Sequence, residues 1–176
     1  MPTRQAACLI GPMKRVFESF YSGCDGSGCR IVNEKIEEFF ERYQKCFNKA
    51  LKEATEIDAK EMAQCFSDCF IAANPAGVAC GRNDEELKSQ ILRGLQFYRS
   101  IGTRSMIVLE IAVTALDQIH ALARVRWQSQ YRKRDGEGER IDFDVIYLLQ
   151  INGERPRIFA YITGDEEEAL RERGLI

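Results

Sequence analysis

The chain has 176 residues, of which 45% are hydrophobic, and this length fits a single domain with a substantial core. Its 25 basic and 27 acidic side chains nearly balance, so a net charge of −2 gives no overall attraction to nucleic acid or to an anionic membrane. No stretch approaches the roughly 20 apolar residues of a membrane span. The seven cysteines are odd in number and lack a disulfide-type spacing, which favours reduced thiols and a cytoplasmic protein.

Residues 1–30 differ in composition from the rest of the chain, and we interpret them as an N-terminal extension or arm. The glycines between Ser22 and Cys29 follow no predicted strand and precede no Gly-Lys-Ser/Thr, so they do not match a phosphate-binding loop. Cys8, Cys24 and Cys29 have neither the spacing of a zinc knuckle nor a nearby histidine. We therefore expect no cofactor and no metal there, and a single domain over residues 31–176.

The first half of this domain is predicted to be mostly helical. From Ile31 to Ala54 apolar residues recur every three or four positions, which is the stripe of a long amphipathic helix. Asp58, with Glu61 three positions later, resembles a capping box for a short second helix that ends near Ser67. Turn residues then separate three further elements, which are short strands at Cys69–Ala73 and Val78–Cys80 and a helix from Asn83 that Gly102 stops.

The second half is predicted to be mostly strands, because four runs rich in β-branched and aromatic residues follow one another between turn signals. The runs are Thr103–Leu116, Ala121–Lys133, Arg140–Ile151 and Pro156–Thr163. Within the third run apolar and polar residues alternate, so one face is buried and the other exposed. Asp165 and the three glutamates after it place acid at the start of a final helix, which Gly174 ends.

The second and third runs are expected to pair as a hairpin around Gly136-Glu137-Gly138. Symmetric closure there sets Trp127 opposite Tyr147, Tyr131 opposite Phe143 and Arg132 opposite Asp142. Strands that cluster after helices favour an α+β fold over an alternating parallel sheet. We therefore predict a curved, mostly antiparallel sheet wrapped around the N-terminal helices to form a cone.

This element order and two segments, Glu41-Arg42-Tyr43 and Ala73-Asn74-Pro75-Ala76-Gly77, resemble the nuclear-transport-factor-two-like superfamily over roughly Val32 to Gly164. The superfamily includes ketosteroid isomerases, SnoaL-like polyketide cyclases and scytalone dehydratase. The resemblance implies a cystatin-like roll and, because members commonly dimerise through the convex sheet face, a homodimer. One fold hosts many functions, so it does not by itself imply a reaction.

Three positions can be compared with the ketosteroid isomerases. Tyr43 matches the tyrosine that donates a hydrogen bond to the substrate oxygen, and Tyr147 falls near the position of a second, protonated acid. Asn74 stands where those enzymes have an aspartate that moves the proton. An amide cannot take up a proton at neutral pH, so this sequence lacks the usual isomerase base.

The favoured hypothesis is a small-molecule-binding protein with an apolar aromatic pocket for a small apolar ligand. The expected ligand-binding residues are Tyr43, Phe47, Phe70, Asn74, Trp127, Phe143 and Tyr147. This set contains phenols, an amide and an indole, but no acid or base. Ordinary structural roles compete with this hypothesis: the tyrosines and Trp127 also suit a packed core, and Asn74 suits a turn.

Two alternatives remain open. The first is an enzyme of the cyclase, isomerase or dehydratase type acting on a polyketide- or steroid-like substrate, which requires a carboxylate such as Glu110 or Asp144 to face inward. The second is a homodimeric protein-interaction module, whose convex face carries the residues Val108, Ala112, Arg124 and Arg126. Neither alternative calls for nucleic acid or a membrane as a partner.

Overall fold

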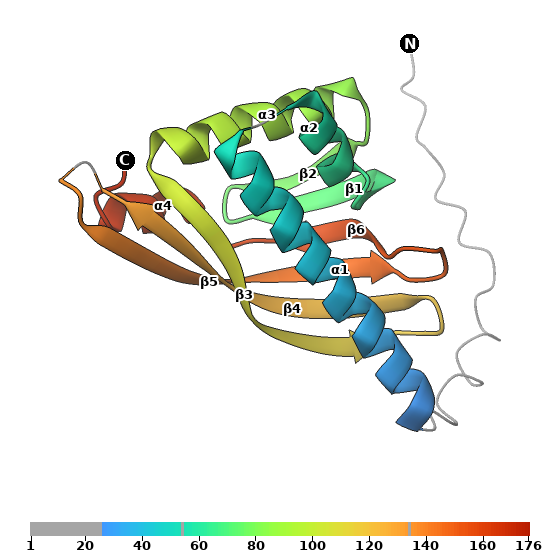
Figure 1. Ribbon diagram of the computed structural model, residues 1–176. Coiled ribbons are helices and arrows are strands. Elements are labelled where there is room, and N and C mark those ends of the chain that lie inside the picture. Colours follow the sequence, from blue (N-terminus) through green and yellow to red (C-terminus); the bar gives the residue numbers. More distant parts are fainter. Residues whose placement is uncertain (1–25, 54, 134) are drawn as a thin grey trace, which may run out of the picture.

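The computed structural model describes residues 26–53, 55–133 and 135–176, which form a six-stranded sheet and four helices. The strand order is β2-β1-β6-β5-β4-β3 (Figure 1). Neighbouring strands are antiparallel except for β1 and β6, which run parallel. The strands are β1 (Phe66–Asn74), β2 (Gly77–Arg82), β3 (Thr103–Ala115), β4 (His120–Arg132), β5 (Gly138–Gln150) and β6 (Arg157–Ile162). The α+β class and the mostly antiparallel sheet predicted from the sequence are confirmed.

The helices lie mainly on one side of this sheet. Figure 1 shows α1 crossing the sheet diagonally, with α2 and α3 near one of its ends. They are α1 (Gly26–Lys52), α2 (Glu56–Ala63), α3 (Glu85–Ser100) and α4 (Glu166–Glu172). α1 begins before the predicted start at Ile31, and residues 1–25 of the predicted arm lie outside the described part of the chain. Within that part, no helix has both the length and the hydropathy that crossing a bilayer requires.

The predicted apolar stripe of α1 is buried against the inner face of the sheet. Ile36, Phe39 and Phe40 are almost fully buried. The Phe40 ring contacts Trp127 of β4 and Tyr147 of β5, with ring centroids 6.2 and 4.9 Å apart. Burying side chains of this size contributes about 2–3 kcal/mol each, so α1 is held to the sheet by its aromatic face.

The start of α2 differs from the prediction by one turn. Thr55, not Asp58, is the N-cap: its hydroxyl accepts a hydrogen bond from the Asp58 amide, and the Asp58 carboxylate accepts one from the Thr55 amide at 3.1 Å. Asp58 therefore occupies the third helical position of the capping box. Because α2 ends at Ala63, before the predicted end at Ser67, β1 begins three residues earlier than expected.

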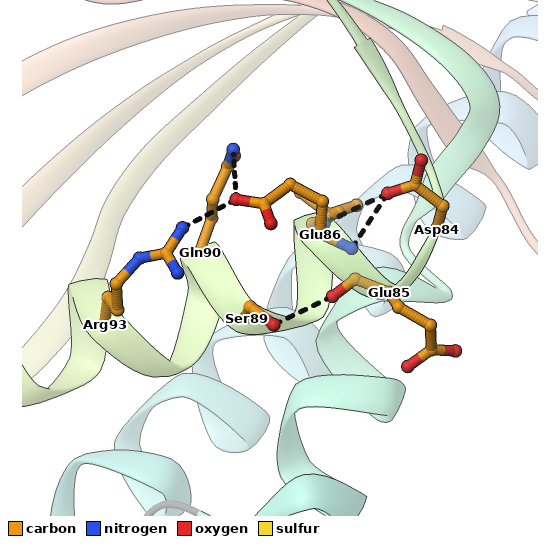
Figure 2. Close-up of polar contacts among 7 residues, drawn as sticks. Asp84, Glu85, Glu86, Ser89, Gln90 and Arg93 are labelled. Atoms are coloured by element: carbon orange, nitrogen blue, oxygen red, sulfur yellow. Dashed lines mark hydrogen bonds and ion pairs between the residues drawn. The ribbon is translucent and has the colours of Figure 1, made fainter.

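α3 is capped by Asp84, one residue after the predicted start at Asn83. The Asp84 carboxylate accepts hydrogen bonds from the Glu86 and Leu87 amides, as Figure 2 shows for the first turn. The Glu86 carboxylate in turn accepts hydrogen bonds from Gln90 and Arg93 along the exposed side of the helix. The Asn83 amide instead donates to the carbonyls of Ala63 and Phe66, which joins the end of α2 to β1.

The predicted register of the β4–β5 hairpin is wrong by four residues. Trp127 pairs with Phe143 rather than with Tyr147, and Arg132 pairs with Gly138 rather than with Asp142. The turn closes around residue 135, where the Lys133 amide donates to the Glu137 carbonyl at 2.8 Å. Because an even shift keeps every side chain on its predicted face, the inner aromatic face of the hairpin is as expected.

Candidate functional site

A cavity of about 690 Å³ opens beside the inner face of the sheet. Every strand and the helices α1, α3 and α4 contribute to its wall, which also includes the β1–β2 turn and the segment after β6. Most of the lining is apolar or aromatic, and the volume lies within the range of ordinary small-molecule sites.

Five of the seven predicted pocket residues line this cavity, namely Tyr43, Phe47, Asn74, Phe143 and Tyr147. The other two do not. Trp127 is fully buried behind the wall, with its ring centroid 6.1 Å from that of Tyr43. Phe70 packs against Phe66 and Tyr161 and covers the backbone of Gly81. The cavity wall thus contains no indole, and Trp127 and Phe70 form part of the core around it.

The inner wall presents neutral phenols to the cavity. Burial raises the pKa of Tyr43 well above its ordinary value, and burial also raises the pKa of Tyr147. Trp127 Nε1 is buried and makes no hydrogen bond within normal limits to any described residue. The Trp127 indole lies close to the Tyr147 hydroxyl and lowers the pKa of that phenol against the larger effect of burial. Both tyrosines can donate hydrogen bonds at neutral pH.

Asn74 has a turn role at the edge of the cavity. Its Oδ1 accepts a hydrogen bond from the Ala76 amide at 3.0 Å, which closes the β1–β2 turn. Such a hydrogen bond is the usual reason for asparagine at a turn. Its side-chain oxygen is thus already engaged within the protein.

Acidic groups also line the cavity, so the expectation of a wall without acid or base is wrong. They are Asp165 and Glu166, from the segment that the sequence analysis assigned to the start of the last helix. That helix start is confirmed, because Asp165 caps α4 and its carboxylate accepts a hydrogen bond from the Glu168 amide. The Thr163 amide donates to the Ala73 carbonyl at 2.9 Å, which keeps the chain after β6 at the cavity edge.

The Glu166 carboxylate is joined to α3 by a hydrogen bond. The Tyr98 hydroxyl donates to Glu166 Oε1 at 2.7 Å across the cavity wall. Glu166 as a residue is exposed, but its carboxyl lies against this wall, where desolvation raises its pKa and the Tyr98 hydrogen bond partly offsets that rise. Burial also raises the pKa of Tyr98, so the partner of the Glu166 carboxyl is a neutral phenol at neutral pH.

The two acids named as possible inward-facing groups lie elsewhere. Asp144 is on the outer face of the sheet, where it accepts hydrogen bonds from Arg124 Nε and Nη2 at 3.1 and 2.5 Å. Glu110 pairs with Arg126 in the strand register and lies in a shallow outer depression. Val108, expected on the convex face, instead pairs with Trp127 and packs against the core.

Sequence signals for the Tyr98–Glu166 pair are weak. Tyr98 belongs to the predicted apolar stripe of α3, where a tyrosine indicates core, and Glu166 belongs to an acidic run that indicates a helix start. The pairing of β6 with β1 and the hydrogen bond from Thr163 to Ala73 place the start of α4 at the cavity edge, and neither pattern predicts them. Among the described residues, no group of three or more His, Cys, Asp or Glu side chains is arranged to hold a metal ion.

The six-stranded sheet with helices packed on its inner face is the fold of solved structures described as having a cystatin-like fold. One similar structure is an NTF2-like protein with a cystatin-like fold from Novosphingobium aromaticivorans, with a TM-score of 0.62, 15% identity and coverage of 88% of this chain and 99% of that chain. A candidate scytalone dehydratase from the same organism gives a TM-score of 0.60 at 12% identity, covering 78% and 86% of the two chains. A Catenulispora acidiphila protein solved in complex with S-DNPA gives 0.57 at 13% identity, covering 81% and 98%.

The family itself is established by sequence. The chain belongs to the family described as NTF2-like protein (DUF6841), whose model matches residues 33–166. No curated protein matches the sequence. The matched range agrees closely with the extent of the resemblance found in the sequence, roughly Val32 to Gly164, and confirms it.

Proposed function

We propose that the protein binds a small, largely apolar molecule in the cavity between α1 and the inner face of the sheet. The cavity of about 690 Å³ carries this proposal. Apolar and aromatic walls with a few polar groups are typical of sites that bind and orient small molecules. The Catenulispora neighbour was solved in complex with S-DNPA, and this supports a ligand-binding role for the fold.

The proposal assigns no residue the role of the aspartate base that ketosteroid isomerases use. Asn74 occupies the corresponding position, and its side-chain oxygen serves the β1–β2 turn. The proposal includes a cytoplasmic location, which the free thiols of Cys46 and Cys65 support because reduced cysteines are typical of that compartment. It also includes a homodimer through the outer sheet face, and it needs neither nucleic acid nor a membrane as a partner.

The test is a thermal-shift screen of apolar and aromatic compounds, because a ligand that binds only the folded state raises the melting temperature. We expect hits with the wild-type chain. Val145→Phe places a larger side chain in the cavity and should abolish the shifts, while the control Ile146→Phe, on the opposite face of β5, should preserve them. A broad screen without any shift, or shifts unaffected by Val145→Phe, would contradict the proposal.

An enzyme of the cyclase, isomerase or dehydratase type is the second candidate, and Glu166 is the observation that favours it. Desolvation raises the pKa of this carboxyl, which is the direction that suits a group transferring a proton to or from a bound ligand. The same screen distinguishes the two candidates when each hit is incubated with the protein and examined by mass spectrometry and NMR. Recovery of unchanged ligand supports binding alone, whereas conversion that Glu166→Gln abolishes supports the enzyme.

A further inference from the structure

The charged side chains that line the cavity are all acidic. Of the described lining residues, the acidic ones are Asp165 and Glu166, and none is lysine, arginine or histidine. Asp165 is already engaged as the N-cap of α4, since its Oδ1 accepts from the Glu168 amide at 2.9 Å. Glu166 is therefore the carboxylate that a ligand can approach.

The Glu166 carboxylate is held in place but not neutralised. Tyr98 donates to Oε1, and no described residue donates a hydrogen bond to Oε2 or forms an ion pair with the group. Its contact with a neutral phenol fixes one oxygen toward α3 without supplying a positive charge. The second oxygen remains available to a charged donor.

Aromatic rings surround the same space. Tyrosine and phenylalanine side chains from helices and strands line the cavity together, and they are Tyr43, Phe47, Phe66, Tyr98, Tyr131, Phe143, Tyr147 and Tyr161. The face of such a ring attracts a cation, and this attraction is larger where water is excluded. The rings therefore favour the same charge that the carboxylate favours, while their area suits an apolar body.

We infer that the cavity prefers an organic cation, with an aromatic or aliphatic body along the inner rings and an ammonium group at Glu166. This inference rests on the proposed function, because it concerns the ligand class of the same cavity. The ammonium group donates to Glu166 Oε2 and lies near the phenol rings, and charge-assisted hydrogen bonds of this kind are stronger than neutral ones. An anionic ligand would meet the carboxylate with like charge and be disfavoured.

Isothermal titration calorimetry with three probes of equal shape tests the inference. Naphthylmethylamine, naphthylmethanol and naphthoate present a cation, a neutral hydroxyl and an anion on the same ring system. At about pH 8 the amine is charged, and the pH lies well above the ordinary pKa of a glutamate, about 4.3. We expect the amine to bind about tenfold or more tightly than the alcohol, and the carboxylate to bind weakest.

Two variants and a pH series locate the preference. Glu166→Gln should remove the advantage of the amine over the alcohol, while Glu168→Gln, in the same helix turn but outside the cavity lining, should retain it. Circular dichroism checks that both variants fold. In the wild-type chain the advantage of the amine should shrink as the pH falls, because desolvation raises the pKa of Glu166 and its protonation removes the negative charge. The other titratable groups near it are Tyr98, Tyr131 and Asp165.

The outcomes separate this inference from the proposed function. Equal binding of amine and alcohol, or an amine preference that survives in Glu166→Gln, overturns the inference while ligand binding itself stands. If none of the three probes binds but neutral compounds give hits in the thermal-shift screen, the inference is likewise overturned while ligand binding stands. Failure of all three probes together with an empty screen overturns both proposals.

Discussion

At the residue scale, the contacts of Asp58 predict that this side chain contributes measurably to the free energy of unfolding. It is 1% exposed, and its carboxylate accepts hydrogen bonds from Thr55 and forms an ion pair with Lys49 at 2.8 Å. Asp58→Ala should lower the free energy of unfolding by about 2 kcal/mol, mostly through the lost capping-box hydrogen bonds with Thr55, since Lys49 is largely exposed and its ion pair is screened. Urea unfolding followed by circular dichroism measures the change.

The contribution of Asp58 should also depend on pH. Hydrogen bonds from Lys49 and then Thr55 lower its pKa in the folded state, so its stabilising effect is present above the unfolded pKa of about 4 and is lost as the pH falls through the folded value. The difference between wild type and Asp58→Ala should therefore shrink in acid. Asp68→Ala, at a side chain 96% exposed, is the control and should change little. A difference that stays constant to low pH would contradict this account.

At the residue scale, the sequence predicted the inner wall but missed the acid at its edge. Tyr43 and Tyr147 followed from periodicity, because a helix stripe and a strand alternation each point to one face. Glu166 could not follow from such a pattern. Its position depends on where the segment after β6 lies, and the hydrogen bond from Thr163 to Ala73 that fixes this segment joins residues far apart in sequence.

At the element scale, the existence and order of helices and strands were predictable, while pairing and ends were not. Gly136 and Gly138 both allow a turn, and the chain uses Gly136, at a positive φ of 91°, so the hairpin closes two residues earlier than expected. Thr55 and Asp58 are both competent caps, and tertiary contacts with Lys49 favour the arrangement observed. These choices differ by little local free energy, so local sequence cannot decide them.

The junction between α3 and β3 predicts a strong effect at Gly102. Its φ is +84°, and a Cβ there would lie 2.2 Å from the Arg132 carbonyl oxygen of β4. Gly102→Ala should therefore lower the free energy of unfolding by about 2 kcal/mol or more, because both the backbone conformation and the close approach require glycine.

Gly94, inside α3, is the matched control. A Cβ there meets no atom within 4 Å, so Gly94→Ala should raise stability by about 0.5–1 kcal/mol through helix propensity alone. Thermal and urea unfolding of both variants provide the comparison. Equal and small effects of the two substitutions would show that the α3–β3 junction is not constrained as described.

At the scale of the whole molecule, the sheet order is the feature that sequence reasoning could not supply. The parallel pairing of β1 with β6 brings the N-terminal hairpin and the C-terminal segment together and forms one side of the cavity. Such pairing depends on long-range packing rather than on local pattern. The same arrangement leaves the outer face of β3, β4 and β5 uncovered by the described helices. The inner face holds the cavity of the proposed ligand, and the outer face is open to the proposed partner copy.

That outer face predicts the behaviour of the chain in solution. Arg124 and Asp144 form an ion pair there, and Arg126 and Asp142 form another at 3.4 Å. Each of these arginines lies beside an aspartate. In two copies related by a two-fold axis, the arginines of one copy can therefore pair with the aspartates of the other. Sedimentation of the wild-type chain at micromolar concentration should show a homodimer.

Charge reversal on this face should weaken the dimer. In a symmetric dimer the substitution Arg124→Glu is present in both copies, and in each it places a negative charge beside Asp144. The dissociation constant of the dimer should therefore rise about tenfold or more. The control is Arg93→Glu on α3, which makes the same change of charge at a site away from the outer sheet face and breaks the exposed Arg93–Glu86 pair. This variant should leave the dimer intact. A wild-type monomer, or equal weakening by the two variants, would exclude specific association through the outer face.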